Sequence, residues 1–154
     1  TLAVTNAGYS IHPDHKGAAE FVRSLPHHRG DLVLAEDVNQ QTYYLGRVDY
    51  WLIGPDIAET FSKEAPNGQL VDIYTSTPII SSAKDLQRLI DDPTRGDIYI
   101  IGSGEQQEDG RRSARGPEIS GLLDHLAPEM VYSGRDGLTK VWRIRSVGKT
   151  GETR

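Results

Sequence analysis

The first part of the chain carries a helical pattern of apolar positions. Between residues 14 and 25 the apolar side chains recur at i, i+3, i+4 and i+7. The four positions are Ala18, Phe21, Val22 and Leu25. Asp14 is suited to cap the first free backbone N–H groups, and Pro26 cannot continue a helix. The pattern therefore predicts a helix over 14–25 with one face turned inward.

Three short apolar runs predict strands of a buried sheet. Continuous runs of this kind are typical of parallel strands, which helices cover on both faces. The runs are Asp31–Ala35, Tyr50–Ile53 and Asp97–Ile101. A short helix is expected between the first two, from Asp37 to Leu45, with Gly46 closing it in the left-handed conformation.

The second half of the chain predicts two further helices and a hairpin. Apolar residues recur at helical spacing over 82–91 and over 118–126. Two apolar stretches, 130–133 and 138–145, flank a glycine-containing turn, which is typical of a β-hairpin. Residues 56–68 have no clear period, and the strand pattern returns only at 70–74.

Helices and strands alternate at intervals of roughly 30 residues, which is typical of parallel α/β sheets. We therefore predict an α/β fold: a Rossmann-like, mainly parallel sheet with flanking helices and a C-terminal antiparallel hairpin. The 154 residues are expected to form one soluble α/β domain, 1–154, since this is a common domain size. Its ordered core is expected over about 14–146, with a flexible loop at about 102–116 and a frayed tail at 147–154.

Composition and charge narrow the classes of function. The chain is 36% hydrophobic and 25% charged, as globular proteins are, and its formal net charge is −5. Because a nucleic-acid surface needs a basic stripe, this charge argues against a nucleic-acid partner. The absence of cysteine excludes disulfides, zinc–thiolate sites and cysteine nucleophiles, and it leaves the redox compartment open.

The sequence gives no sign of a membrane span or a secretory signal. No apolar run reaches the ~18–20 residues that cross a bilayer, so we expect the chain itself to be soluble. It begins at Thr1 without a methionine, as expected of a processed or trimmed fragment. A parent protein with membrane segments is compatible with this start.

Three motifs that suggest chemistry are better explained by turns and caps. Gly102 and Gly104 follow a predicted strand, but the third glycine and the helix of a dinucleotide loop are missing. Histidines lie at both ends of the first helix, roughly 18 Å apart, whereas catalytic zinc needs three ligands at one place. These are His12, His15, His27 and His28. The Ser and Thr residues of 75–82 lack a Gly-x-Ser-x-Gly elbow. We predict no catalytic residue, no metal ligand and no cofactor site.

Aromatic and charged residues concentrate between residues 42 and 52. This segment holds three tyrosines, a tryptophan, an arginine and an aspartate, in a chain that is 7% aromatic. Flat aromatic faces beside charged groups are suited to bind a sugar or an aromatic partner, and loops after parallel strands form the usual crevice. The candidate binding residues are Asp37, Tyr43, Arg47, Asp49, Trp51 and Asp72. The alternative is that Tyr44, Tyr50 and Leu52 pack in the core while Arg47 pairs with Asp49.

Five stretches of the sequence carry a family resemblance. In chain order they are Ala18–Arg23, Gly30–Leu34, Tyr43–Leu52, Val71–Thr75 with Pro78–Ile80, and Gly96–Ile101. Together they resemble the soluble tail of multi-spanning membrane glycosyltransferases of the GT-C superfamily. The resemblance is to the group of dolichyl-phosphate-mannose protein mannosyltransferases and lipid A aminoarabinose transferases. It covers about Ala18 to Arg145, with one gap in the polar loop.

The resemblance implies a parent enzyme that takes a sugar from a polyprenyl-phosphate donor. In that family the tail lies on the extracytoplasmic face, and the catalytic carboxylates lie in loops of the membrane half, so no catalytic residue is implied here. The implied role is a non-catalytic accessory domain that contributes to acceptor or glycan binding or to assembly. The implied partners are the membrane-embedded half of the same polypeptide and a glycan, lipid-linked sugar or protein acceptor. The alternative is a free-standing Rossmann-like nucleotide- or small-molecule-binding protein or enzyme.

Overall fold

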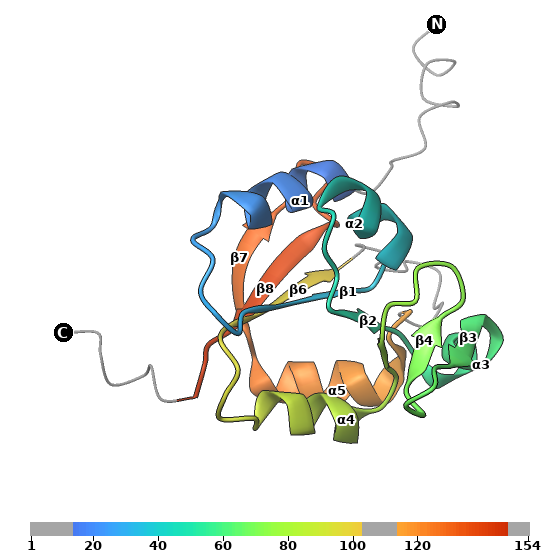
Figure 1. Cartoon of the computed structure of the whole chain (residues 1–154). Coiled ribbons are helices and arrows are strands. Elements are labelled where there is room, and N and C mark those ends of the chain that lie inside the picture. The colour runs from blue at the N-terminus through green and yellow to red at the C-terminus, as the bar shows by residue number, and fades with distance from the viewer. Residues whose placement is uncertain (1–13, 103–113, 148–154) are drawn as a thin grey trace, which may run out of the picture.

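A computed structural model of the chain describes residues 14–102 and 114–147. In chain order the elements are α1 (His15–Ser24), β1 (Leu32–Ala35), α2 (Val38–Tyr44), β2 (Tyr50–Leu52), α3 (Pro55–Phe61), β3 (Ser62–Glu64), β4 (Leu70–Asp72), β5 (Ile79–Ile80), α4 (Ala83–Ile90), β6 (Ile98–Gly102), α5 (Gly116–Leu126), β7 (Glu129–Ser133) and β8 (Lys140–Ile144). Six of the strands form one sheet in the order β5-β2-β1-β6-β8-β7 (Figure 1). Helices α1 and α2 cover one face of it, and α4 and α5 cover the other. The predicted α/β fold with a C-terminal antiparallel hairpin is confirmed.

The three strands predicted from apolar runs lie side by side at the centre of the sheet. β1 pairs in parallel with β2 on one side and with β6 on the other, so that Leu34 lies opposite both Tyr50 and Ile100. β5 continues the parallel part beyond β2, and β8 pairs antiparallel with β6. The carboxyl ends of β5, β2, β1 and β6 therefore meet at one edge of the sheet, the carboxyl edge, and their starts meet at the opposite amino edge.

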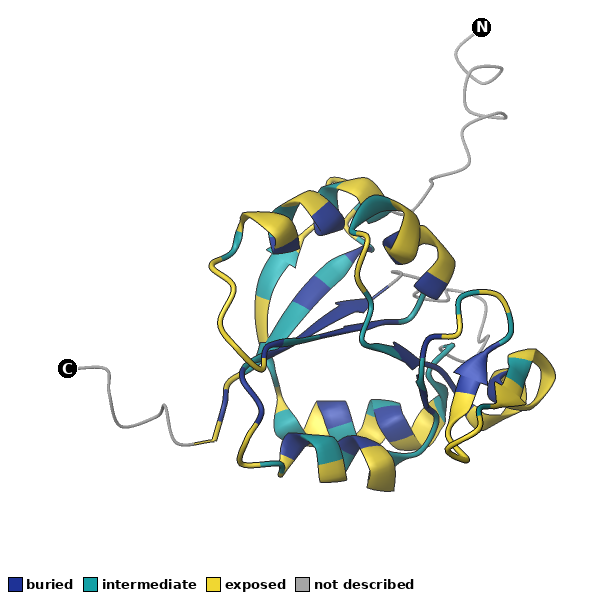
Figure 2. Cartoon of the chain, viewed as in Figure 1, coloured by how far each residue is buried: buried dark blue, intermediate teal, exposed yellow. Residues whose placement is uncertain are grey.

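Successive residues of the central strands pack on opposite faces of the sheet. Val33 and Ala35 pack with Ala18 of α1, whereas Leu34 and Ile100 pack with residues of α4 and α5. All five residues of β6 are buried, and Figure 2 shows the dark central strands between the two helical layers. Because both faces are covered, these strands need continuous apolar runs, which is why the sequence pattern identified them.

Local capping also agrees with the sequence. The side chains of Asp14, Asp37 and Ser82 each accept a hydrogen bond from the backbone N–H three residues further on, at the start of α1, α2 and α4. After α2, Gly46 has φ +77°, a conformation that favours glycine. The ends of these helices are therefore fixed by a few local side chains.

The middle of the chain departs most from the sequence pattern. Residues 56–68 had no predicted element, yet they contain most of α3 and all of β3, and β3 pairs with β4 in a separate two-stranded sheet. The strand expected at 70–74 extends only over Leu70–Asp72. In α3 only Ala58 is buried, so no apolar stripe marks this helix. Of the expected polar loop, Gly102 ends β6 and Gly116 begins α5, while 103–113 lie outside the described residues, as does the tail from 148.

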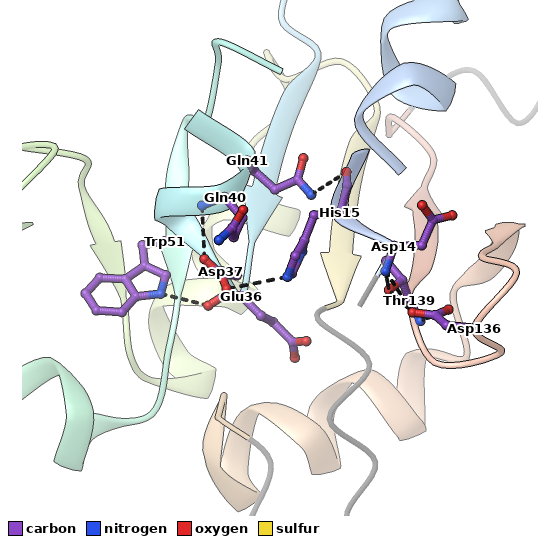
Figure 3. Close-up of polar contacts among 9 residues, drawn as sticks. All are labelled: Asp14, His15, Glu36, Asp37, Gln40, Gln41, Trp51, Asp136 and Thr139. Atoms are coloured by element: carbon purple, nitrogen blue, oxygen red, sulfur yellow. Dashed lines mark hydrogen bonds and ion pairs between the residues drawn. The ribbon is translucent and has the colours of Figure 1, made fainter. Parts of the chain in front are cut away.

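A hydrogen-bond network ties the start of α1 to the C-terminal hairpin. The Asp14 backbone N–H donates to the Asp136 carboxylate at 2.8 Å and to the Thr139 hydroxyl at 2.7 Å (Figure 3). The Tyr132 hydroxyl donates to the Asp14 carboxylate at 2.7 Å. Burial and this bond raise the pKa of Tyr132 to about 12. These four residues form the N-terminal clasp, which joins segments more than a hundred positions apart in the chain.

Arg95 is buried at the amino edge and binds three backbone carbonyl groups. Its guanidinium donates to the carbonyl oxygens of Ile90 at 2.7 Å, Gly96 at 2.8 Å and Arg145 at 2.9 Å. Burial lowers the pKa of Arg95, although the charge of nearby Asp97 acts in the opposite direction. One side chain thus connects the end of α4, the start of β6 and the segment after β8.

Candidate functional site

The carboxyl edge gathers charged and aromatic side chains from several elements. β1 continues directly into Glu36 and Asp37, β2 leads through Gly54 into α3, and α5 begins close by. Figure 3 shows Asp37 and Gln41 beside His15, which lies in the first turn of α1. Because ligands of parallel α/β sheets bind outside the carboxyl ends of the strands, this edge is the first place to look for a site.

The Asp37 carboxylate contacts both the start of its own helix, α2, and His15 of α1. Its Oδ1 accepts a hydrogen bond from the Gln40 N–H at 3.1 Å, and its Oδ2 lies 3.6 Å from His15 Nε2 (Figure 3). Gln41 Nε2 donates to the His15 carbonyl at 3.1 Å. Within the described ranges, His15 Nδ1 and Gln41 Oε1 are buried without a hydrogen-bond partner. The Asp37 carboxylate therefore lies between the start of α2 and the first turn of α1, with 38% of its side chain exposed.

Glu36 and Arg115 form a largely buried ion pair at the same edge. Arg115 Nη1 lies 3.4 Å from Glu36 Oε1, with the two side chains 17% and 8% exposed respectively. The Arg115 guanidinium also lies over the Trp142 ring, 5.6 Å from its centroid, and its Nε donates to the Ser120 hydroxyl at 3.0 Å. Since separating a buried pair leaves an uncompensated charge, this contact fixes the start of α5 against the end of β1.

Two of the predicted binding residues, Trp51 and Asp72, are buried. The Trp51 indole N–H donates to the Glu36 carbonyl at 3.0 Å (Figure 3). Asp72 Oδ2 accepts hydrogen bonds from the Thr75 N–H and hydroxyl, each at 2.7 Å. The polar atoms of both residues are therefore used within the domain, where they hold a strand end and a turn.

Arg47 and Asp49 lie at the amino edge, away from Asp37. Arg47 Nη2 lies 3.1 Å from Asp49 Oδ2, which also accepts a hydrogen bond from the Val33 N–H at 2.7 Å. Arg47 donates in addition to the carbonyl of Asp31, just before β1. Arg47 and Asp49 lie at this edge because α2 carries the chain back from the end of β1 to the start of β2. The Arg47–Asp49 pairing of the alternative interpretation is present.

Tyr43 is the most exposed of the six predicted residues. It lies on α2 with 80% of its surface exposed, and its ring meets that of Tyr44 edge-on, with centroids 4.9 Å apart. Its face is thus accessible to a partner. The structure brings together Arg47 with Asp49, and Trp51 with the residues after β1, but it does not bring all six candidates into one pocket.

Alanine substitutions will distinguish Tyr43, which is exposed, from Arg47, whose side chain bonds to Asp49 and Asp31. Tyr43→Ala should change the free energy of unfolding by less than ~0.5 kcal/mol, because the side chain is exposed. Arg47→Ala should cost about 1 kcal/mol, since it removes a half-exposed ion pair and the bond to Asp31. Urea unfolding measures both values. A double variant that fails to fold would show that the segment is required for the core.

The sequence did not predict a cavity of ≈ 290 Å³ at the carboxyl edge. It lies between the first turns of α3 and α5, and Ser81, which follows β5, also lines it. The two helices approach closely, since the Gly54 N–H donates to the Ala114 carbonyl at 2.7 Å. α3 carried no apolar stripe, and the lining segments are about sixty positions apart in the chain, so no local pattern pointed to this cavity.

Comparison of the chain with models of protein families, with curated proteins and with solved structures found no match. Among the described residues, no helix combines the length and the apolar character needed to cross a membrane. In the same residues, no three His, Cys, Asp or Glu side chains are grouped so as to hold a metal ion. His12 lies outside the described ranges.

Proposed function

We propose that the chain is a non-catalytic accessory domain of a multi-spanning glycosyltransferase that uses a polyprenyl-phosphate sugar donor. The domain would lie on the extracytoplasmic face and contribute to acceptor or glycan binding or to assembly. The proposal rests on the sequence resemblance over 18–145. Its partners would be the membrane-embedded half of the same polypeptide and a glycan, lipid-linked sugar or protein acceptor.

The contacts of the carboxylates of Glu36, Asp37 and Asp72 support a binding role for these residues over a catalytic one. Glu36 pairs with Arg115, Asp37 caps α2 and faces His15, and Asp72 accepts two hydrogen bonds from Thr75. An acid, base or nucleophile needs a side chain that can reach a substrate atom. Carboxylates that hold helix and strand ends together are suited to a rigid scaffold for binding.

The reading frame that encodes the chain tests this proposal most directly. We expect about ten or more apolar segments, each long enough to span a bilayer, upstream of Thr1. A frame without such segments would contradict the proposal.

In a full-length parent, the double variant of Tyr43 and Arg47 to alanine is expected to lower transferase activity while the melting temperature stays within a few degrees.

The Rossmann-like sheet favours one other candidate, a free-standing nucleotide- or small-molecule-binding protein. The geometry at Gly102 speaks against a phosphate there: a Cβ on this glycine would lie 2.5 Å from the Trp142 ring and 3.1 Å from the Glu36 carboxylate. The Trp142 ring and the Glu36 carboxylate therefore occupy the space through which a phosphate would approach this glycine.

Calorimetry with nucleotides distinguishes the accessory domain from a free-standing nucleotide-binding protein. Titration of the chain with ATP, NAD and sugar nucleotides is expected to give no heat of binding, because the phosphate position beside Gly102 faces a carboxylate and an indole ring. The chain alone is also expected not to hydrolyse glycosides, since the sequence pattern marks no pair of carboxylates as an acid and a nucleophile. Micromolar binding of any of the three nucleotides would favour the free-standing protein.

A further inference from the structure

Three polar side chains around the cavity between α3 and α5 are not engaged by the described part of the protein. They are the carboxylates of Asp56 and Glu118 and the hydroxyl of Ser81, none of which has a hydrogen bond or ion pair within 14–102 and 114–147. Asp56 and Glu118 are also exposed. Glu36 and Asp37, at the same edge, each face another side chain of the protein, Arg115 and His15 respectively. The cavity thus has polar groups that are available to a ligand.

The remaining wall of the cavity is largely apolar. Pro55, Ile57 and Pro117 line it with exposed apolar surface, and buried Ile119 also lines it. The charged residue of this part of the wall is Arg115, which is paired with Glu36. A volume of ≈ 290 Å³ is close to the lower limit of roughly 300 Å³ for pockets that hold small organic ligands. The cavity is therefore matched to one compact ring rather than to a dinucleotide or a long chain.

The charge and polarity of the lining restrict the class of ligand. The carboxylates of Asp56 and Glu118 would repel an anion such as a phosphate or sulfate, and the positive charge of Arg115 in the same wall is already paired with Glu36. A wholly apolar ligand would take these carboxylates out of water without replacing their hydrogen bonds. A sugar ring satisfies both kinds of surface, because its hydroxyl groups donate to carboxylates and its C–H face packs on apolar side chains.

We propose that this cavity binds a single neutral pyranose ring of a glycan. Asp56 and Glu118 accept hydrogen bonds from ring hydroxyl groups, Ser81 exchanges a further one, and the proline and isoleucine side chains pack against the C–H face. The inference rests on the proposed function for the choice of a glycan as the ligand. It gives the accessory domain a binding site different from the segment 42–52.

A second cavity provides the matched control. It has a volume of ≈ 300 Å³ and lies beside β5 and α4, with Asp85 and Arg88 in its wall. These two side chains form an ion pair at 3.5 Å, and the Asp85 side chain is 53% exposed. Asp85→Ala therefore removes an exposed, ion-paired carboxylate from a cavity of similar size.

Nuclear magnetic resonance tests the proposal on the 154-residue chain. The methyl α-pyranosides of glucose, mannose and galactose are titrated into ¹⁵N-labelled protein up to about 50 mM, which detects millimolar affinity. At least one glycoside should shift the backbone amides of Asp56, Ser81 and Glu118. Asp56→Ala and Glu118→Ala should each weaken binding about tenfold, as expected for loss of a hydrogen bond to a charged group. Asp85→Ala should leave affinity within about twofold.

Three results would overturn the proposal. One is the absence of localised shifts with all three glycosides. Another is the same shift pattern with sodium sulfate or with propylammonium chloride, which would mark an anion or amine site instead. The third is unchanged affinity in both alanine variants, provided that their spectra show a folded chain. The reading-frame test is independent. Upstream membrane segments together with no sugar binding would reject the sugar site in the cavity but not the accessory-domain proposal. The absence of upstream membrane segments would reject the accessory-domain proposal itself.

Discussion

Replacing Arg95 by alanine is expected to lower the free energy of unfolding by about 3 kcal/mol. The substitution leaves the carbonyl groups of Ile90, Gly96 and Arg145 without their buried donor, and it opens a gap beneath the start of β6. Hydrogen bonds to a charged group contribute more than neutral ones, and buried acceptors are costly to leave unpaired. Thermal unfolding followed by circular dichroism should show a melting temperature lower by about 10 °C.

Two matched variants separate this effect from the loss of any arginine. Arg88 is 71% exposed and pairs with Asp85 on the surface of α4, so Arg88→Ala should cost less than ~0.5 kcal/mol. Arg95→Lys keeps the charge but cannot present the planar fork that reaches three carbonyl groups, so its stability should lie between those of the wild type and the alanine variant. Equal stabilities of Arg95→Ala and Arg88→Ala would show that the three bonds contribute little.

The layered part of the fold was predictable because its signals are local and redundant. β1, β2 and β6 are buried on both faces, so their apolar runs are continuous. Helices α1 and α4 combine an apolar stripe with a capping side chain, which fixes both their face and their first residue. The closing hairpin carries two apolar stretches around a glycine turn.

The site was less predictable because it depends on where segments meet. Asp37 and Arg47 are ten positions apart, and the sequence suggested one cluster, but the seven-residue helix between them spans about 10 Å and carries the chain to the other edge of the sheet. The Glu36–Arg115 pair and the cavity beside Gly54 join segments that no sequence period relates. They form only where the fold places the segments after β1, β2 and β5 beside the start of α5.

Protonation of the Asp136 carboxylate at low pH is expected to weaken the N-terminal clasp. Its Oδ1 accepts hydrogen bonds from the backbone N–H groups of Leu138 and Thr139, each at 3.0 Å. Its Oδ2 accepts them from the Asp14 N–H at 2.8 Å and the Thr139 hydroxyl at 2.7 Å. Asp136→Asn turns one acceptor into a donor that faces other donors, and should lower the free energy of unfolding by about 2 kcal/mol at pH 7.

The effect should depend on pH in a defined direction. Burial alone would raise the pKa of Asp136, but the four hydrogen bonds together lower it below the ordinary value. A carboxyl group whose pKa is lower in the folded state stabilises the fold above its unfolded pKa of about 3.9, and this stabilisation is lost as pH falls through the folded pKa. Urea unfolding, followed by the fluorescence of the two tryptophans, should therefore show a large difference between wild type and Asp136→Asn at pH 7 that shrinks towards pH 2. Asp124→Asn, on the exposed side of α5, should stay within ~0.5 kcal/mol of wild type at both pH values. An equal gap at both pH values would mean that the charge of Asp136 does not stabilise the clasp, and that its shape alone holds α1 to the hairpin.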